Sequence, residues 1–243
     1  MTEPHETRKR PLWLRGLGLV TLVLFLVGAY LALVVSPPDV NQGQLIRMMY
    51  AHVAVAWVCF VAVIVTALYG MLFLWRGHPI DDARAAANAE VATFFAGLTL
   101  LSGMTYSKPT LNTYWTWDAK LTLTALMFAL LVGYFVVRGL IDDPTRRGRV
   151  SAVVGIIVAV SLPFNYLAAA WFRTLHPTLS VAVTGVHVAP TMLFVLLFNV
   201  GVAGLVYLTF VSERVRIARL ELSRSEAEER REGEMGSGEV VHV

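Results

Sequence analysis

Charged side chains are scarce in this sequence. Asp, Glu, Lys and Arg make up 15% of its 243 residues, and 56% of the residues are hydrophobic. A soluble domain of this size carries roughly 25% charged residues. Six long stretches contain none of the four charged types: 16–38, 48–75, 91–107, 121–137, 150–172 and 174–212. This distribution excludes an ordinary soluble domain.

Cysteine is almost absent. Cys59 is the only one, and it lies inside a hydrophobic stretch. No intrachain disulfide can form, and motifs that need two cysteines, including those for covalent cofactor attachment, are excluded. We interpret Cys59 as a small packing residue.

The uncharged stretches are long enough to cross a membrane. A helix rises about 1.5 Å per residue, so about 20 apolar residues span a hydrocarbon core about 30 Å thick. The first stretch is too long for a signal peptide and lacks a clear cleavage site. We predict an all-α, polytopic membrane protein with about six transmembrane helices, near 16–36, 50–75, 88–105, 121–140, 150–170 and 187–211.

Basic residues predict the orientation of these helices. Cytoplasmic loops of membrane proteins carry an excess of Lys and Arg. Sixteen of the 20 Lys and Arg residues fall in the N-terminal segment, the second and fourth loops and the C-terminal tail. We therefore predict an inner-membrane protein with both termini in the cytoplasm and with loops 37–49, 106–120 and 171–186 facing outward. The same bias explains the net charge of +3, so we infer no nucleic-acid binding.

The chain divides into three predicted segments. Residues 1–15 form a cytoplasmic N-terminal segment, and residues 16–211 form the membrane domain with an outward loop at 106–121. Residues 212–243 form a charged, partly disordered cytoplasmic tail. Glu and Arg are dense through Arg231, so the first part of the tail is expected to prolong the last helix. The Gly- and Ser-containing end is expected to be disordered.

An aromatic cluster marks the second outward loop. Tyr114, Trp115 and Trp117 fall within four residues, and Asp118 follows directly. Trp and Tyr commonly form an interfacial belt, but a belt needs no neighbouring carboxylate. Asp118 is expected to cap the helix that follows. The flat rings can also stack on a flat, apolar ligand.

Three of the six histidines, His52, His176 and His187, lie near the predicted outer boundary. A lone histidine in such a place ordinarily bonds to a neighbour. Two histidines on separate segments that flank an aromatic surface are a different pattern, because neutral imidazole is a common axial ligand of haem iron. Outward basic residues, Arg47 and Lys120 among them, can pair with haem propionates or simply anchor at the interface. The residues alone do not separate haem from other flat ligands.

Residues 114–122, which read Y-W-T-W-D-A-K-L-T, resemble the WWD segment of haem-handling proteins of cytochrome c maturation. They are most similar to the CcmC family, whose segment runs W-D-A-R-L-T; CcmF and CcsA proteins usually continue W-D-P. Residues 50–53, with Arg47 upstream, resemble the CcmC segment Y-x-H-V-P. Residues 171–176 resemble W-W-x-T-L-H. The resemblance covers roughly residues 16–211.

The sequence departs from the family pattern in four places. Leu111 and Asn112 stand where the family usually has W-G, and Tyr106 stands in place of a Trp. Ala54 replaces the Pro after H-V, and Phe172 replaces one Trp of the W-W pair. The aromatic surface is therefore less rich in Trp than the family pattern implies.

The resemblance implies a function and a site. CcmC proteins present haem b, bound transiently and non-covalently, at the outer membrane face and pass it to the chaperone CcmE, together with CcmD and the CcmA–CcmB ABC transporter. It implies binding and transfer rather than catalysis. We predict His52 and His176 as the axial ligands of haem iron, with His187 as the alternative. The predicted binding surface adds Tyr114, Trp115, Trp117, Asp118, Trp171, Arg47 and Lys120.

Three other functions stay open. A haem lyase of the CcmF or CcsA type would need the W-D-P pattern, and CcmF is far longer than this chain. A quinol-linked cytochrome b subunit usually places histidine pairs within helices, and no two histidines share a predicted span here. A non-haem membrane scaffold or transport subunit would use its aromatic residues only as a belt. The visible absorption spectrum distinguishes the scaffold from a haem protein.

Overall fold

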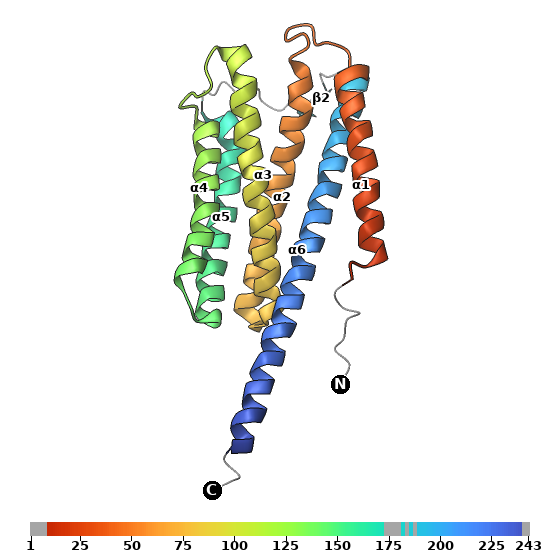
Figure 1. Ribbon diagram of the computed structural model, residues 1–243. Coiled ribbons are helices and arrows are strands. Elements are labelled where there is room, and N and C mark those ends of the chain that lie inside the picture. The colour runs from red at the N-terminus through yellow and green to blue at the C-terminus, as the bar shows by residue number, and fades with distance from the viewer. Residues whose placement is uncertain (1–8, 173–180, 183–184, 187–188, 240–243) are drawn as a thin grey trace.

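The computed structural model describes residues 9–172, 181–182, 185–186 and 189–239, which form six long helices and one short β-pair (Figure 1). The helices are α1 (Leu12–Tyr30), α2 (Ile46–Arg76), α3 (Pro79–Leu111), α4 (Ala119–Leu140), α5 (Pro144–Trp171) and α6 (Pro190–Glu239). One turn of π-helix, η2 (Leu31–Val35), continues α1, and β1 (Val181–Ala182) pairs antiparallel with β2 (Gly185–Val186). All six helices are long and apolar enough to cross a membrane, which confirms the predicted all-α membrane fold.

Helix α3 is longer than the predicted span at 88–105. It begins at Pro79, whose missing N–H costs nothing in the first turn of a helix. Asp81 and Asp82 follow in that turn, where carboxylates interact favourably with the positive end of the helix dipole. The polar first turns therefore continue the helix beyond the part that hydropathy identifies.

Helix α6 also exceeds its predicted span. It leaves the bundle at one end and continues as a single helix to Glu239 (Figure 1), past Arg231, where the dense Glu and Arg pattern ends. Glu and Arg side chains on such a helix keep its surface hydrated and can pair with one another. The division of the chain into three segments stays a prediction.

Helix α2 lies at the centre of the bundle and packs against α3, α5 and α6, while α1 packs on α6 and α4 packs on α3 and α5. Close contact with α5 depends on glycine. A Cβ atom at Gly70 would lie 3.3 Å from Ala152 Cα, and one at Gly155 would lie 3.3 Å from Thr66 Cγ2. Small residues of this kind let helices approach closely within a membrane.

Buried hydrogen bonds join helices through residues that are far apart in the sequence. Tyr207 Oη in α6 donates to Asn88 Oδ1 in α3 at 2.6 Å. Asn165 Nδ2 in α5 donates to Thr124 Oγ1 in α4 at 2.9 Å. The hydrophobic effect drives little association between helices in lipid, so such hydrogen bonds help to fix the relative positions of the helices.

The bundle has two distinct ends. The start of α1, the α2–α3 and α4–α5 connections and the end of α6 share one end (Figure 1). The connection from η2 to α2 and the loop between α3 and α4 lie at the opposite end (Figure 1). Two of the loops predicted to face outward are thus together, and we call this end of the bundle the outer end. Which end faces the cytoplasm stays a prediction from the basic residues.

Candidate functional site

His52 lies in the second turn of α2, and its ring is partly buried against α3. Its Nδ1 atom is 2.9 Å from Ser102 Oγ. The ring also lies against the backbone at Gly103, where a Cβ atom would come within 3.0 Å of His52 Cε1. Two successive residues of α3 therefore fix the position of this predicted iron ligand.

The loop before α2 is attached to the same region. Backbone N–H groups of Gln42 and Asn41 donate to Asp39 Oδ1, each at 2.8 Å. These bonds favour the charged carboxylate and lower the pKa of Asp39. Tyr106 Oη in α3 donates to Gln42 Oε1. The last turns of α3 thus hold the first outer loop through Tyr106 and hold His52 through Ser102.

The aromatic loop begins with a left-handed residue. Helix α3 ends at Leu111, and Asn112 has φ +57°. Asn is, after Gly, the residue that most readily adopts this conformation at a helix C-terminus. Lys108 Nζ donates to the carbonyl oxygen of Asn112 at 3.1 Å and lies 5.4 Å from the ring centroid of Tyr114. Asn112 therefore permits the backbone turn that a glycine would make at this departure from the family pattern.

The two tryptophans of the loop form one aromatic pair. The rings of Trp115 and Trp117 meet edge to face, with centroids 5.6 Å apart. Thr113 Oγ1 donates to the carbonyl oxygen of Trp115 at 3.0 Å. Trp117 is 83% exposed, and Tyr114 is also exposed. The loop thus presents aromatic surface outward while Trp115 faces inward.

Asp118 is the N-cap of α4, as the sequence predicts. Its carboxylate accepts the backbone N–H of Lys120 at 3.0 Å. The Lys120 side chain is half-buried in the first turn of the helix. Asp118 therefore fixes where the loop ends; direct roles of Asp118 and Lys120 in ligand binding stay predictions.

Two buried N–H groups at the outer end, Arg47 Nε and Trp115 Nε1, have no hydrogen-bond partner among the described residues, as is also true of the buried hydroxyl of Thr122. A buried donor without a partner costs about 1–3 kcal/mol. Both are N–H groups, so the ligand that would satisfy them is an acceptor such as a carboxylate. Haem propionates have this chemistry, which fits the predicted ligand.

The second predicted ligand, His176, lies outside the described residues, as do His187 and the neighbouring Arg173. Trp171 ends α5, is exposed and meets Phe164 edge to face with centroids 6.3 Å apart. That position also suits an interfacial belt residue.

No cluster of three His, Cys, Asp or Glu side chains able to hold a bare metal ion occurs within the described ranges. Haem does not need such a cluster, because the porphyrin fills four coordination positions and leaves the axial ones to the protein. His176 and His187 lie outside the described ranges.

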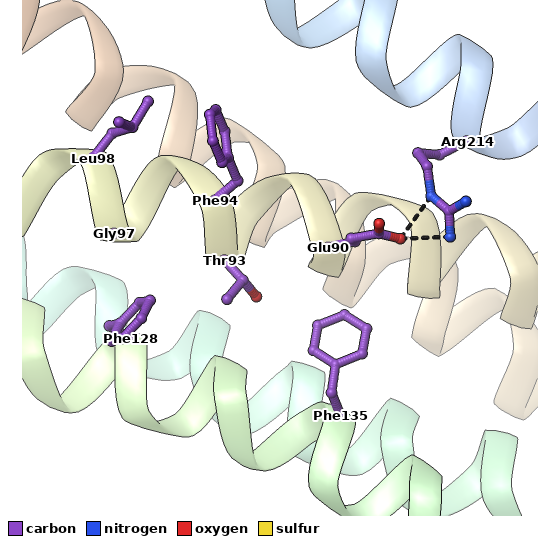
Figure 2. Close-up of a pocket in the computed structure, with 8 residues that line it drawn as sticks. All are labelled: Glu90, Thr93, Phe94, Gly97, Leu98, Phe128, Phe135 and Arg214. Atoms are coloured by element: carbon purple, nitrogen blue, oxygen red, sulfur yellow. Dashed lines mark hydrogen bonds and ion pairs between the residues drawn. The ribbon is translucent and has the colours of Figure 1, made fainter.

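A lateral groove of about 660 Å³ lies elsewhere, between α3, α4 and α6 (Figure 2). It is lined by Glu90, Thr93, Phe94, Gly97, Leu98, Phe128, Phe135 and Arg214, with Glu90 and Arg214 forming an ion pair. None of these residues is His, Cys, Met or Tyr, the side chains that commonly ligate haem iron. The groove contains no predicted site residue and is not the candidate site.

Sequence comparison decides the family. The family described as heme exporter protein C (CcmC) matches residues 6–231. The chain belongs to the CcmC family. A heme exporter protein C of Bradyrhizobium diazoefficiens is 35% identical over 167 residues, which cover 68% of this chain and 62% of the relative. A putative cytochrome c biosynthesis ccmC-like mitochondrial protein of Arabidopsis thaliana is 32% identical over 217 residues, 87% of this chain and 82% of the relative.

A heme exporter protein C of Escherichia coli is 29% identical over 163 residues, 66% of this chain and 65% of the relative. The chain thus spans slightly less than two thirds of both bacterial relatives. The CcmC match includes α1 to α5 and most of α6. It confirms the resemblance inferred from the Trp-Asp loop and its flanking histidine segments.

The sequence did not identify three residues that shape the site. Ser102 and Gly103 lie inside an apolar span, and nothing in the sequence shows that they face His52. The left-handed Asn112 could have been anticipated, because Asn is a common residue at a helix C-terminus. The first two depend on how α2 and α3 pack, which hydropathy does not report.

Proposed function

We propose that this protein holds haem b at the outer face of the inner membrane and passes it to the chaperone CcmE during cytochrome c maturation. Membership of the CcmC family supports a role in haem handling. The observation that supports the finer proposal is the contact of His52, in the second turn of α2, with Ser102 and Gly103 of α3. The loop between α3 and α4 lies at the same end of the bundle as the start of α2 (Figure 1). Haem binding here is transient and non-covalent.

Each residue has a distinct proposed role. His52 and His176 ligate the iron, with His187 as the alternative to His176. The exposed rings of Tyr114 and Trp117 lie against the porphyrin, since flat aromatic surfaces stack favourably. Arg47, Trp115 and Lys120 donate hydrogen bonds to the haem propionates. Asp118 fixes the end of the aromatic loop, and Trp171 contacts the edge of the porphyrin.

The proposed partners follow from the same placement. A loop whose aromatic side chain is largely exposed can be reached by a chaperone at the membrane surface, so CcmE would take haem from this side. CcmD and the CcmA–CcmB transporter would contact the protein within or beneath the bilayer, and lipid surrounds the remaining helix faces. The proposed activity is binding and transfer, which needs no catalytic residue.

Reporter fusions test the proposed orientation. Alkaline phosphatase, which is active only outside the cytoplasm, is expected to be active when inserted at the exposed Val40 and inactive when inserted at the exposed Arg146. The reason is the basic excess at the Arg146 end. Activity at Arg146 with none at Val40 would reverse the orientation and place the aromatic loop in the cytoplasm.

Trp117→Ala tests the transfer step. Because Trp117 is 83% exposed, the substitution is expected to leave expression and folding unchanged. Losing its stacking surface, worth about 0.5–1.5 kcal/mol, is expected to lower haem loading of CcmE by about twofold to 13-fold. Covalent haem on CcmE is measured by haem staining after denaturing electrophoresis.

Trp75→Ala is the matched control for this experiment. Trp75 is 80% exposed but lies at the end of α2 opposite the aromatic loop. Its substitution is expected to leave CcmE loading unchanged. Equal loss in both variants would mean that exposed tryptophans act only as membrane anchors.

A further inference from the structure

The hydroxyl of Ser102 has three neighbours and only one proton. Its Oγ atom lies 2.7 Å from the carbonyl oxygen of Leu98, 3.2 Å from that of Thr99 and 2.9 Å from His52 Nδ1. Carbonyl oxygens only accept, and 2.7 Å is the usual length of an O–H···O bond. The Ser102 hydroxyl therefore donates its hydrogen bond to the carbonyl oxygen of Leu98.

That direction determines the bond to His52. Because Ser102 Oγ already donates its hydrogen bond to the carbonyl oxygen of Leu98, it can only accept a hydrogen bond from the imidazole. Nδ1 of His52 must then carry a proton. In the neutral ring this places the lone pair on Nε2.

We propose that Ser102 is a positioning residue that holds His52 in the Nδ1–H tautomer, so that Nε2 is the atom that ligates haem iron. The iron-ligating part rests on the proposed function; the tautomer does not. Ser102 itself touches neither iron nor porphyrin in this proposal. It acts through the imidazole alone.

Gly103 completes the seat of the ring. A Cβ atom at this position would lie 3.0 Å from His52 Cε1, closer than ordinary van der Waals contact, and 3.6 Å from Nδ1. The ring thus packs directly on the α3 backbone while the preceding residue accepts its N–H. Contacts with these two residues of α3 therefore restrict both the position and the rotation of the ring.

Such a bond matters for a metal ligand. Histidines that bind metals usually donate their other ring N–H to a fixed acceptor, and losing that acceptor typically weakens metal binding tenfold to 100-fold. The bond also raises the basicity of the ligating nitrogen, which favours ferric over ferrous haem. Removing it is expected to weaken haem binding and to raise the reduction potential.

The tautomer is tested on the haem-free full-length protein. With ¹⁵N-labelled histidine, nuclear magnetic resonance near neutral pH is expected to show a protonated Nδ1 and an unprotonated Nε2 for His52, assigned by the loss of these signals in His52→Ala. Ser102→Ala is expected to produce a mixture of tautomers, and Ser102→Thr, which keeps the hydroxyl, to preserve the Nδ1–H form. A bare Nδ1 in the wild type, or a spectrum unchanged by Ser102→Ala, would overturn the assignment.

The consequence for haem is measured in the intact complex. Ser102→Ala is expected to weaken haem binding about tenfold and to raise the reduction potential, and Ser102→Thr to restore both. Thr105→Ala is the matched control, because Thr105 bonds to the carbonyl of Leu101 at 2.8 Å in the same way on the exposed side of α3. Wild-type affinity and potential in Ser102→Ala would overturn the positioning role. Full haem binding in His52→Ala would instead overturn the proposed function, and the tautomer measurement would still decide the role of Ser102.

Discussion

His52→Ala is expected to remove most of the haem that copurifies with the complex and to stop haem loading of CcmE. The expected loss exceeds the roughly tenfold to 100-fold caused by removing only a hydrogen-bond partner of a metal ligand, because the ligand itself is gone. Haem per protein is measured as the pyridine haemochrome, and CcmE loading by haem staining. His176→Ala is expected to behave in the same way.

His78→Ala is the control for this loss. His78 is exposed at the opposite end of the bundle, and its side chain makes no capping bond to α3. Its substitution is expected to leave haem content unchanged. Normal loading of CcmE by both His52→Ala and His176→Ala would show that these histidines are not the ligands.

The largest expected effect on stability is that of Arg138→Ala. Arg138 in α4 donates two hydrogen bonds to Asp82 in α3, at 2.6 and 2.9 Å, and the two side chains are only 16% and 14% exposed. Removing the guanidinium leaves a largely buried carboxylate without its partner, which is expected to cost about 2 kcal/mol. The measurement is the free energy of unfolding of the purified protein in mixed micelles.

Arg214→Ala is the comparison for this experiment, because it removes the same kind of ion pair from a more exposed position. Arg214 bonds to Glu90 at 2.6 Å, but these side chains are 40% and 48% exposed. Exposed ion pairs contribute about 0.5 kcal/mol, so little change is expected. Equal destabilisation in both variants would show that burial does not determine the strength of these pairs.

Hydropathy predicted the six helices because it reports where the chain can enter lipid. It did not predict their full length. The first turns of α3 carry Asp81, Asp82 and Arg84, and the end of α6 is dense in Glu and Arg, so both helices continue where a hydropathy window stops. The part of a helix that lies in water is indicated by capping residues and hydrogen-bonding side chains, not by apolar composition.

Part of the candidate site could likewise be predicted from the sequence, and part could not. Local chemistry predicted the Asp118 cap, since Asp before a helix accepts its free N–H groups. The bond between His52 and Ser102 joins residues 50 positions apart and depends on the register between α2 and α3. Periodicity assigns each residue to a face of its own helix but does not align one helix with another, so this contact could not be predicted from the sequence.

The choice of His176 as the second ligand still rests on the family resemblance, because that residue lies outside the described part of the chain. His52 lies within the described part of the chain, where it contacts Ser102 and Gly103 of α3, and its role as a ligand is likewise a proposal. An experiment on the complex tests both assignments together.

The visible and electron paramagnetic resonance spectra of the complex purified with its partners test the central claim most directly. Two histidine ligands predict a low-spin haem spectrum, with His52→Ala and His176→Ala each losing it, by conversion to high spin or by loss of haem. A complex that carries no haem under any condition, or one whose low-spin spectrum survives both substitutions, would contradict it.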